Sequence, residues 1–122
     1  MSGFTELEIA VLHAILAETP EWRTGLEQQL NGATVLSRQN TGVGFFTLIV
    51  VPAQASRVGC PNALGHDVHA QVPGLTYGLG FVLFLKDGRL RMLEGYAVDT
   101  DSTAGLHLEN MTFEVRKGGF GK

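Results

Sequence analysis

The chain has 122 residues, of which 44% are hydrophobic and 17% charged, and its formal net charge is −3. These values are typical of one globular domain with its own core, and they argue against nucleic acid or an anionic membrane as the main partner. The single cysteine, Cys60, cannot form an internal disulfide, and the N-terminus lacks the pattern of a signal peptide. We therefore expect a soluble, cytoplasmic protein.

Two helices are predicted at the start of the chain. Thr5 and Glu8 have the spacing of a capping box, and the apolar residues that follow recur at helical intervals. The second helix is expected from Pro20 to Leu30, with Thr19 as its N-cap and proline in the first helical position.

From Ala33 onward the hydrophobic pattern changes to the period of strands. Strands are predicted over residues 33–38, 43–51, 67–72 and 106–115, together with a hairpin within residues 78–97. Residues 53–66 and 99–105 are expected to form surface loops, and the glycine-rich tail 116–122 is expected to fray.

The hairpin is expected to be the middle of the sheet, because its strands are apolar on both faces and Asp87-Gly88 favours a type I′ turn. With a regular register, Glu94 pairs with Phe81. One face then carries Phe81, Leu83, Leu85, Leu90, Met92 and Glu94, and the other carries Val82, Phe84, Arg91 and Leu93.

These elements predict an α+β fold in which two N-terminal helices pack on one face of a largely antiparallel sheet of five to six strands. The whole chain, residues 1–122, is expected to form one domain. Because two short helices can cover only one face, the other face needs the 53–66 loop or a second subunit over it, and we expect a homodimer.

Glu94 is the leading candidate for chemistry, because burial beside Phe81 would suit a carboxylate to acid–base catalysis. His69 and Asp67 are the other candidates, since both project to one face if residues 67–72 form a strand. The alternative is structural: Glu94 is solvated, or it forms an ion pair with Arg91, His69 or Arg38.

Other chemistry finds weaker support in the sequence. Residues 66–69 (His-Asp-Val-His) suggest a metal site, but on a strand only Asp67 and His69 project to one face, and Glu94 and His107 would be needed as further ligands. The acidic run at 99–103 lacks the glycine and glutamate of a calcium loop. A catalytic Cys60 would need His66 or His69 folded over it. The Gly-x-Gly pairs lead into strands rather than helices, so we expect neither a cofactor nor a bound metal.

Three stretches together resemble a group of small, stand-alone bacterial proteins of unestablished function. They are residues 4–8 (Phe-Thr-Glu-Leu-Glu), residues 41–47 (Thr-Gly-Val-Gly-Phe-Phe-Thr) and the pattern that runs from Gly80 to Tyr96. The resemblance implies a bacterial, cytoplasmic origin, and it implies no activity, cofactor or site residue.

Two classes of function remain open, and whether the chain is an enzyme stays undecided. The favoured class is a binding or interaction protein, of immunity or regulatory type, that presents a sheet edge or the 53–66 loop to a protein partner. The alternative is a small-ligand binder or enzyme with a cleft at the sheet end that uses Glu94, His69 and Asp67, with Arg38 or Tyr96 as further members.

Overall fold

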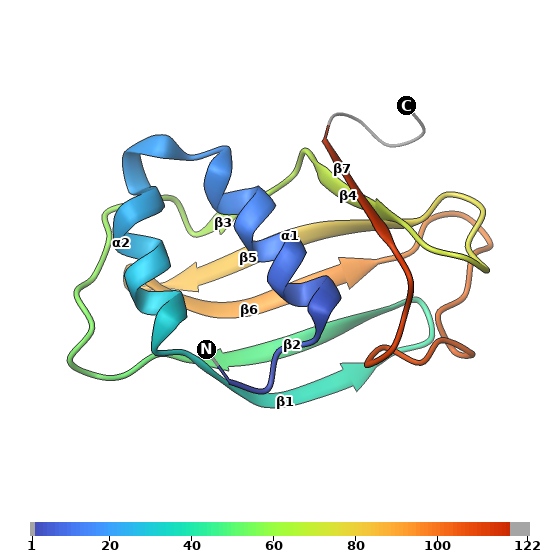
Figure 1. Cartoon of the computed structure of the whole chain (residues 1–122), viewed down its shortest axis with the longest axis horizontal. Coiled ribbons are helices and arrows are strands. Elements are labelled where there is room, and N and C mark those ends of the chain that lie inside the picture. Colours follow the sequence, from blue (N-terminus) through green and yellow to red (C-terminus); the bar gives the residue numbers. More distant parts are fainter. Residues whose placement is uncertain (1, 118–122) are drawn as a thin grey trace.

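The computed structural model describes residues 2–117, and its central elements are β5 (Leu79–Lys86) and β6 (Arg89–Tyr96), as the sequence predicts (Figure 1). Asp87 and Gly88 join these strands with φ angles of 54° and 73°. Positive values at both positions are what a two-residue type I′ turn requires. A Cβ atom on Gly88 would also lie 2.7 Å from the carbonyl oxygen of Val58, so glycine is needed there for space as well.

The strands follow the order β1-β2-β6-β5-β4-β7, and each neighbouring pair is antiparallel. Besides the central pair, the sheet contains β1 (Thr34–Asn40), β2 (Gly44–Val50), β4 (Val68–Gln71) and β7 (Glu114–Lys117). The two-residue strand β3 (Ala63–Leu64) pairs with β5. The architecture is therefore the predicted α+β fold, with β3 as an additional short strand.

Both helices, α1 (Glu6–Ala17) and α2 (Pro20–Asn31), lie on one face of this sheet (Figure 1). The predicted capping box is confirmed at α1, where the Thr5 and Glu8 side chains each accept from the other residue's backbone N–H. The predicted cap of α2 is wrong in one respect. The Thr19 hydroxyl donates to the Leu16 carbonyl and makes no capping bond, because it is engaged with the end of α1.

The core lies between the helices and the sheet. Phe45 of β2 and Phe81 of β5 meet edge to face there, with ring centroids 6.3 Å apart. Gly95 of β6 makes room for this pair, since a Cβ atom at that position would lie 2.4 Å from the Phe45 ring. Within residues 2–117, neither helix is long and apolar enough to cross a membrane.

A β-bulge at Arg91 corrects the predicted register of the central hairpin. The two pairs beside the turn form as expected, but Phe84 then pairs with Met92 instead of Arg91. The extra residue in β6 shifts every later pair by one position, because two residues of a bulged strand oppose one residue of its partner. Side chains beyond the bulge therefore change faces relative to the prediction.

The shift exchanges the faces of Leu93 and Glu94. Leu93 pairs with Leu83, and both are completely buried in the core on the helix side. Glu94 pairs with Val82 rather than Phe81, and it lies on the face opposite the helices. The sequence-based prediction placed these two residues the other way round.

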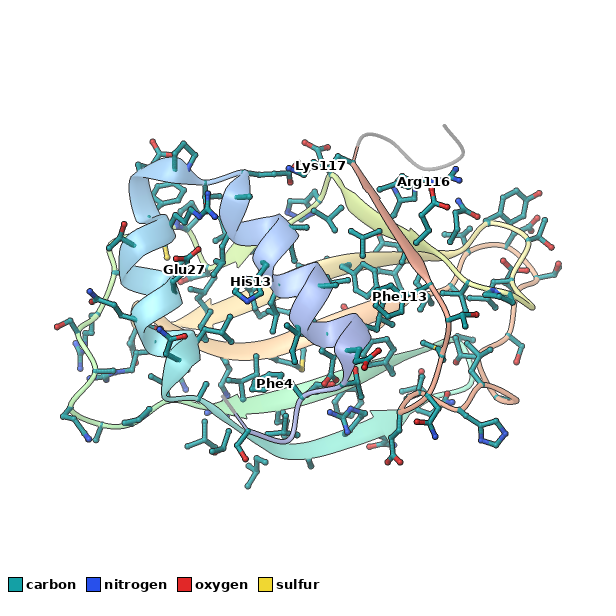
Figure 2. All side chains as sticks on the ribbon, viewed as in Figure 1. Phe4, His13, Glu27, Phe113, Arg116 and Lys117 are labelled. Atoms are coloured by element: carbon teal, nitrogen blue, oxygen red, sulfur yellow. The ribbon has the colours of Figure 1, made fainter. Side chains whose placement is uncertain are left out.

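The predicted last strand is also wrong in its extent. Only Glu114–Lys117 is a strand, paired with β4, whereas residues 106–113 form an irregular segment that crosses the helix-covered face beside α1 (Figure 1). Phe113 of this segment packs partly buried against the core (Figure 2). Arg116 and Lys117, predicted in the frayed tail, pair with His69 and Val68, and the rest of that tail lies outside the described residues.

The long segment 53–66 is anchored to the rest of the fold. The Gln29 amide, almost fully buried on α2, donates to the carbonyl oxygens of Ser56 at 2.9 Å and Gly88 at 2.8 Å. Its own carbonyl oxygen accepts from the Leu90 N–H at 3.0 Å. One side chain thus joins a helix, this loop and the central hairpin, and the short strand β3 lies within the segment.

Candidate functional site

Glu94 lies half-buried on the open face, as we call the sheet face opposite the helices. Its neighbours in register are Phe46 on β2 and Val82 on β5. Among the described residues the Glu94 carboxylate forms neither a hydrogen bond nor an ion pair, and the expected pairing with Arg91, His69 or Arg38 is not found. The carboxylate is therefore available to a group outside this part of the chain.

His69 belongs to the same face and to the neighbouring row of residues. It pairs with Gly80, which pairs in turn with Tyr96, so the two rings lie on either side of a glycine. Because β5 separates β4 from β6 and the two residues lie one row apart, the backbones of His69 and Glu94 are about 12 Å apart. His69 is only 2% exposed, which closes its ring to a substrate that arrives from solvent.

Asp67 does not join these residues. It is exposed in the turn before β4, which begins at Val68, so the alternation expected to place Asp67 beside His69 does not reach it. Glu94, His69 and Asp67 line none of four well-defined surface hollows on the described residues. Nor do the described residues bring together three or more acidic, histidine or cysteine side chains that could hold a metal ion.

Arg38 has a structural partner that the sequence did not indicate. Its guanidinium forms two hydrogen bonds to the Glu8 carboxylate, at 2.8 Å and 2.5 Å, and Glu8 is 1% exposed. Thr47 also donates to this carboxylate, and the backbone N–H of Thr5 completes its coordination. The hydrogen bond to Glu8 raises the pKa of Arg38, and the pair fixes the start of α1 to β1 and β2.

The Cys60 thiol is half-buried, and this burial raises its pKa. A nucleophilic cysteine requires the opposite change, a lowered pKa that populates the thiolate. His66, which the catalytic hypothesis for Cys60 would use, is exposed. The structure therefore gives this thiol no activated environment.

The open face carries an apolar cluster at its centre. Its members are paired across three adjacent strands, and all are half-buried: Phe46, Leu48, Val82, Phe84 and Met92. Val50, at the end of β2, is 44% exposed. The two helices and the segment 106–113 lie on the other face of the sheet, so they do not cover this cluster.

A basic groove lies at the hairpin end of the open face. Pairing between β2 and β6 ends at Leu48 and Met92, where the bulge bends β6 away. Beyond this point the two strands border a groove of about 320 Å³ whose charged lining is Lys86, Asp87, Arg89 and Arg91, with Val50 and other apolar residues of the two strands in its wall. In the sequence, the three basic residues that flank the Asp87-Gly88 turn are the signal of this groove.

The Arg89 side chain is held in place, whereas its two basic neighbours are not. Its Nη2 atom donates to the carbonyl oxygens of Ala53 at 2.9 Å and Ala55 at 3.2 Å. Lys86 and Arg91 are exposed, and they form no hydrogen bond or ion pair with any residue that the structure describes. The groove therefore presents positive charge on a chain whose net charge is negative.

Comparison with known proteins finds no matching family, no matching curated protein and no matching solved structure.

Proposed function

We propose that this chain is a small interaction protein, of immunity or regulatory type, which acts by binding another protein chain through its open face. The observation that carries the proposal is the apolar cluster on a sheet face that has no helix over it. Contiguous apolar surface of this kind marks protein interaction sites more often than it remains bare. The first chain that binds there is a second copy of the protein, which makes it a homodimer.

The open face is a better binding surface than the two regions favoured from the sequence. The loop 53–66 is anchored by Gln29 and Arg89, so it is not a free segment that could wrap around a partner. The edge strand β1 contains an irregularity between Val35 and Ser37, and Ser2 pairs with its first residue. Bulges and covering segments are devices that block strand addition at a sheet edge.

The proposal places the protein in the bacterial cytoplasm. The single cysteine, which cannot form an internal disulfide, supports this location. The alternative of an enzyme that uses Glu94 and His69 has less support, because His69 is buried and because none of the four hollows contains either residue.

Sedimentation equilibrium at micromolar concentration tests the proposal. The wild-type chain should sediment as a dimer of the 13.1 kDa protomer. Phe84→Glu places a charge in the centre of the apolar cluster and should yield monomers, because burial of an unpaired carboxylate is strongly unfavourable. Thr24→Glu, on the exposed side of α2, is the matched control and should remain dimeric. A wild-type chain that sediments as a monomer would contradict the homodimer.

A further inference from the structure

Charge on the open face is separated along the strands. Lys86, Arg89 and Arg91 lie at the hairpin end, on one side of the apolar cluster. Glu94 lies on the other side of Met92, toward the opposite end of β6. A single strand, β6, therefore carries a basic group and an acidic group on either side of an apolar centre.

The basic end has an unfavourable feature that an acidic group would relieve. Lys86 and Arg89 face each other directly across the two strands, and like charges in that position destabilise a sheet. Asp87, the one acidic residue that lines the groove, sits in the turn. At the other end the Glu94 carboxylate lacks a partner among the described residues. Each end of the face thus has the charge that the other requires.

We propose that two copies pack open face to open face about a two-fold axis that lies between the sheets and runs across the strands at the level of Met92. Glu94 of each copy then enters the basic groove of the other and forms ion pairs with Arg91 and Lys86. This arrangement rests on the proposed function, because it identifies the partner of the open face as a second copy and specifies the orientation of that copy.

Two-fold axes of two orientations could bring these faces together, and the charges distinguish them. An axis along the strands places each residue level with its own copy, so the basic groove would face a second basic groove. An axis across the strands reverses the direction of β6 in the partner and brings Glu94 over the groove. Face-to-face sheets pack about 10 Å apart with strands nearly aligned, a spacing that interdigitating Glu, Arg and Lys side chains can bridge.

Charge reversal tests the arrangement. Glu94→Arg and Arg91→Glu should each weaken the dimer by about tenfold or more in sedimentation equilibrium, because each leaves like charges facing each other in the interface. The double variant, which restores opposite charges, should recover most of the wild-type affinity. Arg23→Glu reverses an exposed charge on α2 and should leave the dimer unchanged. Urea melts of all four variants establish that each is folded.

Cross-linking provides a second measurement that does not depend on affinity. On a Cys60→Ser background, Met92→Cys should be joined to its copy by a short bismaleimide linker, because Met92 lies at the axis. Lys86→Cys should not be joined, because the two Lys86 positions then lie at opposite ends of the interface. Cross-linking at Lys86→Cys would overturn this arrangement. So would a double charge variant whose loss of dimer affinity equals the sum of the two single losses. If the wild type still dimerises, either result leaves the proposed function intact. A wild-type monomer would contradict the homodimer that the proposed function includes.

Discussion

The two faces of the sheet are built from the same strands, yet they are completed in different ways. On the covered face the charged and polar side chains are matched within the chain, as Glu8 is by Arg38 and Thr47. On the open face Glu94, Lys86 and Arg91 have no partner among the described residues, and the apolar side chains between them are half-buried. The covered face is thus completed by folding alone, whereas in our proposal the open face is completed by association.

The largest effect should follow from breaking a charge pair on the covered face. Arg38→Met leaves the buried Glu8 carboxylate without its cation and should lower the free energy of unfolding by about 3–5 kcal/mol. Urea melts measure the change, and the double variant Glu8→Gln/Arg38→Met should regain part of the loss. A small effect of Arg38→Met would mean that Glu8 is accessible to water and that the contrast between the faces is weaker.

The next prediction compares two neighbours in β5 that point to opposite faces. Leu83 is completely buried, and Leu83→Ala should cost about 2–5 kcal/mol through lost contacts and a cavity. Phe84 is half-buried, so Phe84→Ala should cost less than half as much at protein concentrations that keep the chain monomeric. Equal costs in urea melts would show that the open face is as well packed as the core.

The smallest effect concerns the half-buried Asp101, in the loop beyond the end of β6. The backbone N–H groups of Tyr77 and Thr76 donate to Asp101, at 2.8 Å and 3.0 Å, and these bonds lower the pKa of its carboxyl. A lowered folded-state pKa contributes stability that is present above the unfolded value of about 3.9 and lost as the pH falls through the folded value. Asp101→Asn should therefore show a shallower loss of stability below about pH 4 in melts at a series of pH values. If the stability of Asp101→Asn fell below pH 4 as steeply as that of the wild type, this stabilising role of Asp101 would be contradicted.

Much of the fold could be predicted because its signals are local. The Thr5–Glu8 capping box and the Asp87-Gly88 turn each depend on residues within a few positions of one another, and both form as predicted. The position of the hairpin at the centre of the sheet was also predictable, from strands that are apolar on both faces. What the structure adds is the contacts that these elements make with residues far away in the sequence.

The bulge could not be predicted, and the face of Glu94 depends on it. The run Leu90-Arg91-Met92-Leu93 is compatible with a regular strand that buries Met92 and with a bulged strand that buries Leu93. Neither glycine nor proline marks the extra residue. The choice between the two registers is made by packing against the helices, where Leu93 meets Leu83, and that packing is not a property of the strand alone.

The ion pair between Glu8 and Arg38 could not be predicted for a related reason. A capping glutamate was predicted correctly, but the same carboxylate also binds Arg38, which lies 30 residues further along the chain. Similarly, residues 106–113 alternate in a way that suggested a strand, yet Leu106, Leu108, Met111 and Phe113 pack against the core from an irregular segment. In both cases the arrangement depends on tertiary contacts, which the local sequence pattern does not reveal.

The Gln29 amide described above has a consequence for the order in which the molecule opens. It connects α2, the segment that contains Ser56 and the amide of Leu90, so none of these can move away without breaking bonds to the others. Hydrogen exchange of the Leu90 amide should therefore require the concerted release of α2 and the loop, rather than fraying of the hairpin. A loop whose composition suggests mobility would then belong to the most cooperative unit of the protein.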